Sequence, residues 1–202
     1  HRYDYMGFVG KVPWLETPAM DRMACEGAWI RNAFVTTSLS SPSRASILTG
    51  MYSHSHKVVD NSAPMPAGLT FFPEYLQQVG YQTGFFGKWH MGNDTGDPQP
   101  GFNHWESFSG QGEYYNPRLN VNGKWIRYAD STYVTDLLTT HAIEFMKQQQ
   151  TSHKPFMVYL SHKGVHDNFS PANRHKGCYS GKPLVFPPSF DTSKDRITAL
   201  PR

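Results

Sequence analysis

Residues 40–50 read Ser-Ser-Pro-Ser-Arg-Ala-Ser-Ile-Leu-Thr-Gly and follow the short apolar run Ala-Phe-Val at residues 33–35. Proline just inside the start of a helix and glycine just past its end is the favoured asymmetry of helix termini, and Pro42 and Gly50 fit it. The sequence therefore predicts a short helix here, with Ser40 at or just before its N-terminus.

The start of this predicted helix favours an anion. Free backbone N–H groups and the positive end of the helix dipole lie there. Arg44 follows one turn later and projects to the same end. A hydroxyl group, a helix N-terminus and a guanidinium at this spacing suit a sulfate or phosphate ester.

Two motifs resemble the signatures of the type I, formylglycine-dependent sulfatases. The first signature is Cys or Ser, any residue, Pro, any residue, Arg, four further residues and Thr-Gly. Its fixed positions are filled here by Ser40, Pro42, Arg44, Thr49 and Gly50. The second signature is similar to Gly-Lys-Trp-His-Met-Gly at residues 87–92, which follows at the family's kind of separation. The resemblance is to the serine-type form of the family.

This resemblance implies a fold and a domain organisation. The expected fold is an α/β, alkaline-phosphatase-like fold with a central, largely parallel sheet flanked by helices. Sulfatases are considerably longer than 202 residues, so residues 1–202 are expected to be the N-terminal part of the catalytic domain. The first strand and the C-terminal subdomain would then lie outside this chain, since residues 1–4 resemble the family's residues just after the paired Asp of that strand.

The resemblance also implies a catalytic site. Ser40 would be oxidised to formylglycine and would bind a calcium ion together with acidic residues outside this chain. Arg44 would hold the nucleophile and the metal site together. Lys88 would contact a sulfate oxygen and the leaving oxygen, and His90 would orient or deprotonate the nucleophile's second hydroxyl. His166 would contact the substrate as general acid to the leaving alcohol.

Each of these side chains has an ordinary alternative. Arg44 could be a surface helix residue, Lys88 a solvated charge at a strand end, and the histidines satisfied loop residues. Their joint position at the carboxyl ends of predicted strands favours a ligand site, because open α/β sheets bind ligands there. His162 is an alternative to His166, since both follow the same predicted strand.

Local patterns predict the supporting elements. Helices are predicted at residues 17–27, 70–79 and 131–149, strands at 28–35, 81–87 and 155–160, the last one buried, and a hairpin at 120–128. Residues 51–61 are predicted to form a loop, and residues 93–122 an ordered excursion over the active-site face. Cys25 is interpreted as a packed core residue. His54 and His56 are interpreted as making loop hydrogen bonds or substrate contacts, rather than as metal ligands.

Composition excludes several other classes. The formal net charge is +3 and no basic run is present, so nucleic-acid binding has no support. Two cysteines give no disulfide framework. The sequence shows no signal peptide and no apolar run long enough to span a bilayer, although a removed leader remains open. By resemblance, a bacterial periplasmic or secreted location is expected.

The expected substrate is a sulfated carbohydrate. Residues 110–117, 161–166 and 171–177 resemble the mucin-desulfating and N-acetylglucosamine-6-sulfatase branch, which implies cleavage of a 6-O-sulfate from N-acetylglucosamine in mucin or glycosaminoglycan. Another sulfated sugar, a phosphonate or phosphodiester hydrolase of the same superfamily, and a catalytically silent sulfoglycan-binding protein are alternatives. A Ser-His-Asp hydrolase is disfavoured because no G-x-S-x-G elbow is present.

The serine at position 40 has two explanations. A natural serine-type enzyme would need an anaerobic formylglycine-generating maturation enzyme as a partner. A substitution of the usual cysteine is the other explanation, and the natural form is favoured because serine-type sulfatases are frequent in glycan-degrading anaerobes.

Overall fold

The computed structural model describes residues 2–92, 95–187 and 190, and it divides into two compact units. The larger unit is Phe34–Ala172, and the smaller unit combines His1–Ala33 with Asn173–Arg202. All the strands of the described residues belong to the larger unit.

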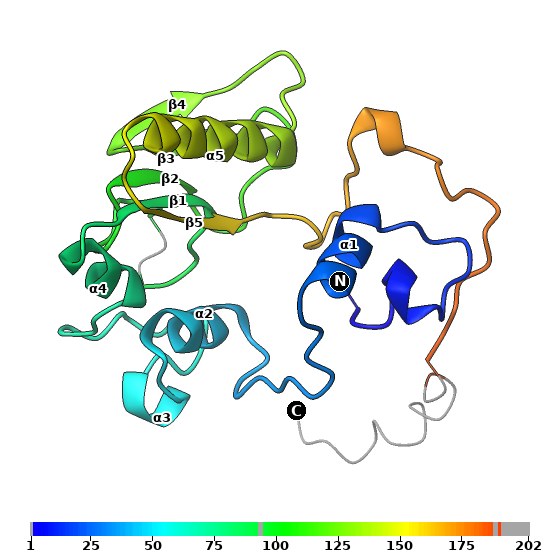
Figure 1. The fold of residues 1–202 in the computed structure, drawn as a ribbon, viewed down its shortest axis with the longest axis horizontal. Helices are drawn as coiled ribbons and strands as arrows, with labels where there is room; N and C mark the ends of the chain where they lie inside the picture. Colours follow the sequence, from blue (N-terminus) through cyan, green and yellow to red (C-terminus); the bar gives the residue numbers. More distant parts are fainter. Residues whose placement is uncertain (1, 93–94, 188–189, 191–202) are drawn as a thin grey trace. The chain divides into compact units, whose positions relative to one another are not determined.

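A five-stranded mixed sheet forms the centre of the larger unit (Figure 1). Its strands are β1 (Gln82–Lys88), β2 (His104–Phe108), β3 (Arg118–Val121), β4 (Lys124–Arg127) and β5 (Phe156–Ser161), in the order β4-β3-β2-β1-β5. β1 pairs in parallel with both β2 and β5, whereas β2 with β3 and β3 with β4 pair antiparallel. The parallel strands β2, β1 and β5 therefore end at one common edge.

Helices cover both faces of this sheet (Figure 1). The long helix α5 (Val134–Thr151) lies on one face, and α2 (Ser40–Thr49), α3 (Ser53–His56) and α4 (Phe72–Gln78) lie on the other side. Adjacent residues of a strand point to opposite faces, and β1 shows this clearly. Phe85 belongs to the apolar cluster under α2 with Ala45, Leu48 and Trp105, while Phe86 belongs to the cluster under α5 with Leu119, Leu138 and Phe145.

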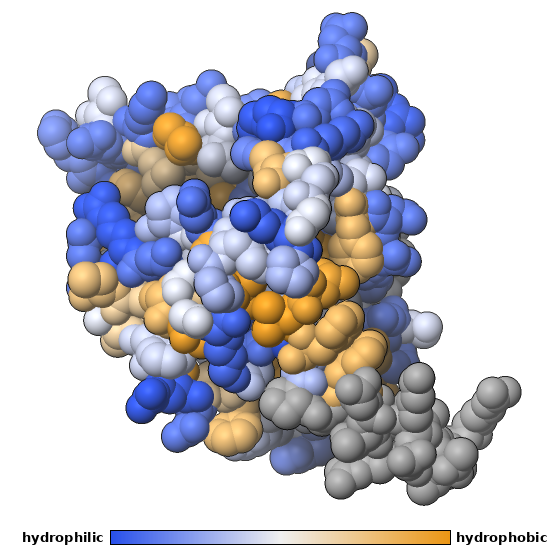
Figure 2. Space-filling view, turned by 90° about the vertical axis from the view of Figure 1, so that its right-hand side faces the viewer, coloured by the Kyte–Doolittle hydropathy of each residue, from blue (hydrophilic) through white to orange (hydrophobic). Residues whose placement is uncertain are grey.

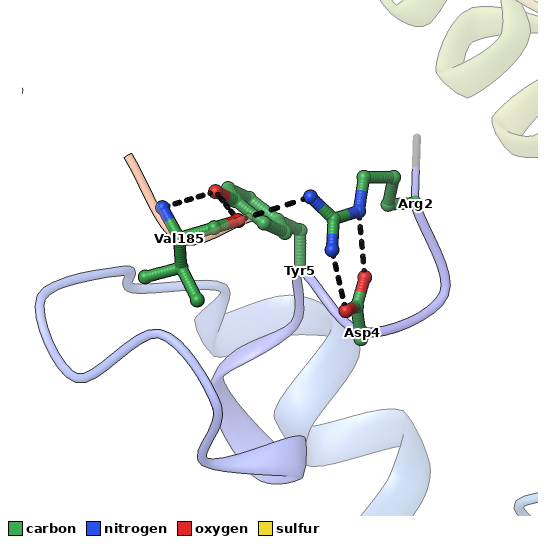
Figure 3. Close-up of polar contacts among 4 residues, drawn as sticks. All are labelled: Arg2, Asp4, Tyr5 and Val185. Carbon is green, nitrogen blue, oxygen red and sulfur yellow. Dashed lines mark hydrogen bonds and ion pairs between the residues drawn. The ribbon is translucent and has the colours of Figure 1, made fainter. Parts of the chain in front are cut away.

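The smaller unit joins the start of the chain to its tail. It contains η1 (Gly7–Val9), α1 (Pro18–Glu26) and η2 (Asn173–His175). Arg2 forms an ion pair with the buried Asp4, with 2.7 Å between Nη2 and Oδ2, and also donates to the carbonyl of Val185 at 3.0 Å (Figure 3). The Tyr5 hydroxyl donates to that carbonyl at 2.9 Å and accepts from the Val185 N–H at 3.0 Å. These bonds connect segments 180 residues apart.

Apolar side chains also reach the surface. Figure 2 shows one face of the molecule on which apolar residues gather within a mostly polar surface. In the smaller unit, Met20, Met23 and Trp29 are exposed and help to line an apolar hollow of about 720 Å³. No helix within the described part of the chain is long and apolar enough to cross a membrane.

Most predicted elements are confirmed. The predicted helices at 17–27, 40–50, 70–79 and 131–149 correspond to α1, α2, α4 and α5. The strands at 81–87 and 155–160 correspond to β1 and β5, and the hairpin corresponds to β3 and β4.

The predicted strand at residues 28–35 is wrong. These residues carry no strand, and Ile30 and Phe34 are 73% and 90% exposed. An apolar run becomes a strand only where another strand accepts its backbone hydrogen bonds, and no such pairing forms among the described residues. The interpretation of Cys25 as a core residue is also wrong, because Cys25 is exposed and α1 buries no residue.

The ordered excursion predicted for residues 93–122 contains the strands β2 and β3 within its described part. Two further predictions need correction. Residues 51–61 contain the single helical turn α3. The strand β5 is only half-buried, because it forms one edge of the described sheet.

Candidate functional site

Ser40 is the first residue of α2, next to the edge at which the parallel strands end. The residue before it, Leu39, has extended backbone torsion angles (φ −134°, ψ 149°) and caps the helix. Ser40 is half-buried and lines a cleft of about 470 Å³ together with Ser43, Arg44 and Ser161. The hydroxyl therefore faces open space at a helix N-terminus, as the sequence predicts.

Lys88 and Arg44 join Ser40 to the sheet. Lys88 is the last residue of β1, is only 3% exposed, and donates from Nζ to Ser40 Oγ at 3.3 Å. Arg44 donates from Nη1 to the Lys88 carbonyl at 2.6 Å and to Ser161 Oγ at 2.7 Å. One guanidinium thus fixes α2 to the ends of both β1 and β5.

Gln111, in the loop after β2, connects the predicted catalytic groups. Its Oε1 accepts from Lys88 Nζ at 2.5 Å, and its Nε2 lies 3.2 Å from His90 Nε2. Because Oε1 is the acceptor toward Lys88, Nε2 must be the donor toward His90. The backbone carbonyl oxygen of Gln111 also accepts a hydrogen bond from Lys163 Nζ at 3.0 Å.

His90 is a neutral imidazole in this environment. Burial lowers its pKa to about 4, helped by the nearby charges of Lys88, Arg44 and His166. Accepting the Gln111 amide at Nε2 places the ring proton on Nδ1. The His90 carbonyl accepts from Ser41 Oγ at 2.5 Å, which ties the second signature to the start of α2.

His166 lies close enough to act on this group without bonding to it. Its charge contributes to the lowered pKa of His90, and its carbonyl accepts from the Tyr114 hydroxyl at 2.7 Å. Its half-buried ring makes no hydrogen bond within the described part of the chain. The structure therefore brings Ser40, Arg44, Lys88 and His90 into one network and leaves the ring of His166 beside it.

Lys163 is a buried cation that the sequence analysis missed. It is 5% exposed, and its ammonium lies 4.7 Å from the centre of the Tyr114 ring. Burial lowers the pKa of Lys163, and the charge of Asp167 partly opposes this. The alternative candidate His162 has its Nδ1 buried without a hydrogen-bond partner among the described residues, and burial lowers its pKa.

The described neighbours of Ser40 do not fit a calcium ion. Calcium is bound by carboxylate and carbonyl oxygens, whereas the described charged groups at Ser40 are the Lys88 ammonium, which bonds its hydroxyl, and the guanidinium of Arg44, which bonds the Lys88 carbonyl. Within residues 2–92, 95–187 and 190, no group of three or more His, Cys, Asp or Glu side chains is arranged to hold a metal. The arrangement fits an anion instead.

The two histidines of residues 51–61 differ in role. His56 is fully buried, accepts from the Val58 N–H at Nδ1 over 3.1 Å, and lies 3.0 Å from Ser46 Oγ at Nε2. The prediction of a loop hydrogen-bonding role is confirmed for His56. His54 is exposed and stacks on Tyr52.

Sequence reasoning found the signature residues but missed Gln111, Ser161 and Lys163. Ser161 and Lys163 follow a predicted strand, so the rule that ligands bind at the carboxyl ends of strands gave a signal for them. Gln111 stands between Gly110 and Gly112, which have φ values of 61° and 67°. Glycines of this kind indicate a tight turn, but nothing local indicates where the intervening side chain points.

The chain is similar to known proteins along most of its length. The family model described as Sulfatase matches residues 1–184. The chain is 41% identical over 176 residues to the N-acetylglucosamine-6-O-sulfatase of Bacteroides thetaiotaomicron, covering 86% of this chain and 30% of that protein. It is 30% identical over 177 residues to the extracellular sulfatase SULF-1 homolog of Drosophila melanogaster, covering 82% of this chain and 16% of that protein.

A solved structure is similar over nearly the whole chain. It contains a protein in complex with its substrate D-glucosamine-2-N,6-O-disulfate, and the similarity has a TM-score of 0.83 at 38% identity. It covers 94% of this chain and 37% of that one. The chain thus spans little more than a third of these proteins at most.

Proposed function

Because this chain belongs to the sulfatase family, with its alkaline-phosphatase-like α/β fold, we propose that the protein hydrolyses a sulfate ester of a carbohydrate. The proposed substrate is a 6-O-sulfate of N-acetylglucosamine in mucin or glycosaminoglycan. Two similarities support it: one relative is named N-acetylglucosamine-6-O-sulfatase, and one similar structure holds D-glucosamine-2-N,6-O-disulfate.

The observation that carries this proposal is the cluster of positive groups around the Ser40 hydroxyl. Lys88 Nζ is 3.3 Å from Ser40 Oγ, and the guanidinium of Arg44 binds the carbonyl of that same lysine. The N-terminus of α2 adds the positive end of its dipole, although the Ser41 N–H there already donates to Asn61 Oδ1 at 3.0 Å and Pro42 has no N–H. A sulfate ester placed against Ser40 would find charge-assisted donors on several sides, which stabilise charge that grows in the transition state.

A plain serine is a weak nucleophile without an adjacent base. Oxidation of Ser40 by a maturation enzyme of the anaerobic type would supply an aldehyde whose hydrate carries two hydroxyl groups, one to attack and one to expel sulfate. The open position of Ser40 in its cleft fits access by such an enzyme. Calcium, implied by the family resemblance, finds no carboxylate ligands among the described neighbours, so no step here uses it.

The chain's own residues would divide the remaining work. Lys88 would bind a sulfate oxygen and the leaving oxygen, and Arg44 would keep Ser40 and Lys88 in register. Neutral His90 would accept a proton at Nε2 once Gln111 turns away from it. His166, whose ring is not engaged by a described hydrogen bond, would donate a proton to the leaving alcohol.

Location outside the cytoplasm is part of the same proposal. Mucin and glycosaminoglycans are extracellular glycans, and one relative is named as an extracellular sulfatase. A bacterial periplasmic or secreted enzyme would meet them.

The test uses the full-length protein produced with its maturation enzyme. Peptide mass across Ser40 should fall by two hydrogen atoms, and sulfate should be released from 6-O-sulfated N-acetylglucosamine. Ser40→Ala should abolish release, while Ser43→Ala, in the same cleft, should retain it. Oxidation with release only from another sulfated sugar would contradict the substrate. Turnover of aryl phosphonates in preference to sulfates, or tight binding of sulfated sugar with unmodified Ser40, would contradict the proposed reaction.

A further inference from the structure

A second cleft, of about 470 Å³, lies on the hairpin side of the larger unit. Its lining includes Ser109, Gly112, Glu113, Arg118, Trp125 and Arg127. Two of these residues are arginines and one is a half-buried tryptophan, and the proposed reaction at Ser40 uses none of the six. Such a combination of a flat aromatic ring and guanidinium groups calls for a functional explanation.

Arg118 and Arg127 face each other directly across the β3–β4 pair. Like charges directly opposite on neighbouring strands destabilise a hairpin. Glu113 relieves only one of them, because it forms an ion pair with Arg127, which also donates to the Asn116 carbonyl at 2.8 Å. The charge of Arg118 is left uncompensated.

Arg118 lies over the ring of Trp125. Its guanidinium carbon lies 4.7 Å from the centre of the indole ring, and within the described residues it makes no hydrogen bond or ion pair. A guanidinium that lies over an aromatic ring still carries N–H donors along its edge. A sulfate or carboxylate can then be bound by two parallel hydrogen bonds.

This cleft shares a wall with the Ser40 site. Ser109 and Gly112 line the cleft, and Gln111, between them, bonds Lys88 and His90. The loop at residues 109–112 therefore borders both sites. The loop is firmly seated, because a Cβ at Gly112 would lie 2.5 Å from the ring of Phe108.

We propose that this second cleft binds an anionic sugar residue that neighbours, in the same glycan chain, the residue whose sulfate lies at Ser40. The Arg118 edge takes its sulfate or carboxylate, and the apolar side of the Trp125 ring packs on the sugar. The identity of the glycan rests on the proposed function, whereas the anion-binding role of Arg118 does not. The cleft gives the protein a preference for sulfated oligosaccharides over the single sugar.

The test measures binding by calorimetry to full-length protein carrying Ser40→Ala, which cannot turn over its ligand. The two ligands are 6-O-sulfated N-acetylglucosamine and a sulfated oligosaccharide that contains it. Arg118→Ala should lower the ratio of oligosaccharide affinity to monosaccharide affinity about tenfold, the loss expected for one charged hydrogen-bonding partner. Arg118→Lys keeps the charge but loses the planar fork, so the ratio should fall in part. Lys124→Ala, on the same hairpin but outside the cleft, is the matched control.

Each outcome upholds or overturns the role of Arg118. An affinity ratio unchanged by Arg118→Ala overturns the proposal, and so does an equal fall with Lys124→Ala, which would show only diffuse charge attraction. Failure of the protein to bind the oligosaccharide overturns it as well. Oligosaccharide binding that depends on Arg118, with no binding of the monosaccharide, would uphold the cleft while refuting the proposed substrate at Ser40.

Discussion

Replacing Glu106 by Gln should destabilise the larger unit more than any ordinary surface substitution. Glu106 lies in β2 with 3% of its surface exposed and accepts hydrogen bonds at both carboxylate oxygens. His104 Nε2, on the same strand, is 2.8 Å from one oxygen, and His141 Nδ1, on α5, is 2.7 Å from the other. The carboxylate therefore ties the long helix to the sheet.

The magnitude follows from those two bonds. A hydrogen bond to a charged group contributes about 1.5–3 kcal/mol, and removing one partner of a buried ion pair costs about 3–5 kcal/mol. The side chains of His104 and His141 are 27% and 23% exposed, so water can replace part of what they lose. We expect Glu106→Gln to lower the free energy of unfolding by about 3 kcal/mol, since the new amide also presents a donor where an acceptor is needed.

The pH dependence gives a second signature. The hydrogen bond that His141 donates to Glu106 raises the pKa of His141 above 6.5. The stabilising effect of this bond is therefore complete below pH 6.5 and is lost as pH rises through the folded-state pKa. Burial works to raise the pKa of Glu106, but bonds from His104 and His141 hold it below 4.5. Its contribution is present above pH 4.5 and is lost as pH falls through the folded-state pKa.

Chemical denaturation of the full-length protein from pH 4 to 8 tests both signatures. The control is Glu144→Gln, on the same helix, where the glutamate is exposed and should matter by less than about 0.5 kcal/mol. Tyr128, whose pKa is raised by burial and by the charge of Glu106, remains neutral over this range. The reasoning is refuted if Glu106→Gln costs no more than Glu144→Gln, or if it leaves the pH dependence unchanged.

Three shorter predictions concern the site and its frame. Gly87→Ala should lower the free energy of unfolding by more than about 3 kcal/mol in denaturation experiments, because Gly87 has a φ of +115° and its new Cβ would lie 1.9 Å from a carbonyl oxygen of β5. In the control Gly123→Ala, the new Cβ meets nothing within 4 Å, so backbone strain alone should cost about 1 kcal/mol. Gln111→Leu should lower kcat/KM about 10- to 100-fold with an unchanged circular dichroism spectrum, and full activity would contradict its bridging role. His90 has a pKa of about 4, so it should stay neutral between pH 7 and pH 5 and should not make kcat/KM fall over that range. A fall of kcat/KM toward pH 5 that is absent in His90→Asn would contradict this.

Local signals were enough for the elements that carry the signatures. Pro42 and Gly50 mark the ends of α2, so this helix was predictable from the sequence. The run at residues 81–87 has a local strand pattern, so β1 was predictable as well. The strand β2 was not predictable from local signals, because its sequence His-Trp-Glu-Ser-Phe buries the carboxylate of Glu106. That burial is favourable because Glu106 is bonded both by His104 and by His141, and His141 is 35 residues away in the sequence. Residues 28–35 failed for the opposite reason, because their own pattern fits a strand and no described strand pairs with them.

In the proposed reaction, the charges around Ser40 would couple sulfate binding to proton transfer. After burial, the largest influence on His90 is the charge of Lys88, followed by Arg44 and His166, and all of them disfavour a second positive charge on its ring. A bound sulfate ester would cancel part of that field, so its arrival would make His90 more basic at the moment a proton must be accepted. The same lysine is bonded to both Ser40 and Gln111, and Gln111 occupies the accepting nitrogen of His90. An anion that draws Lys88 to itself would therefore weaken the Gln111 bridge, and substrate binding itself would release His90 to act as a base.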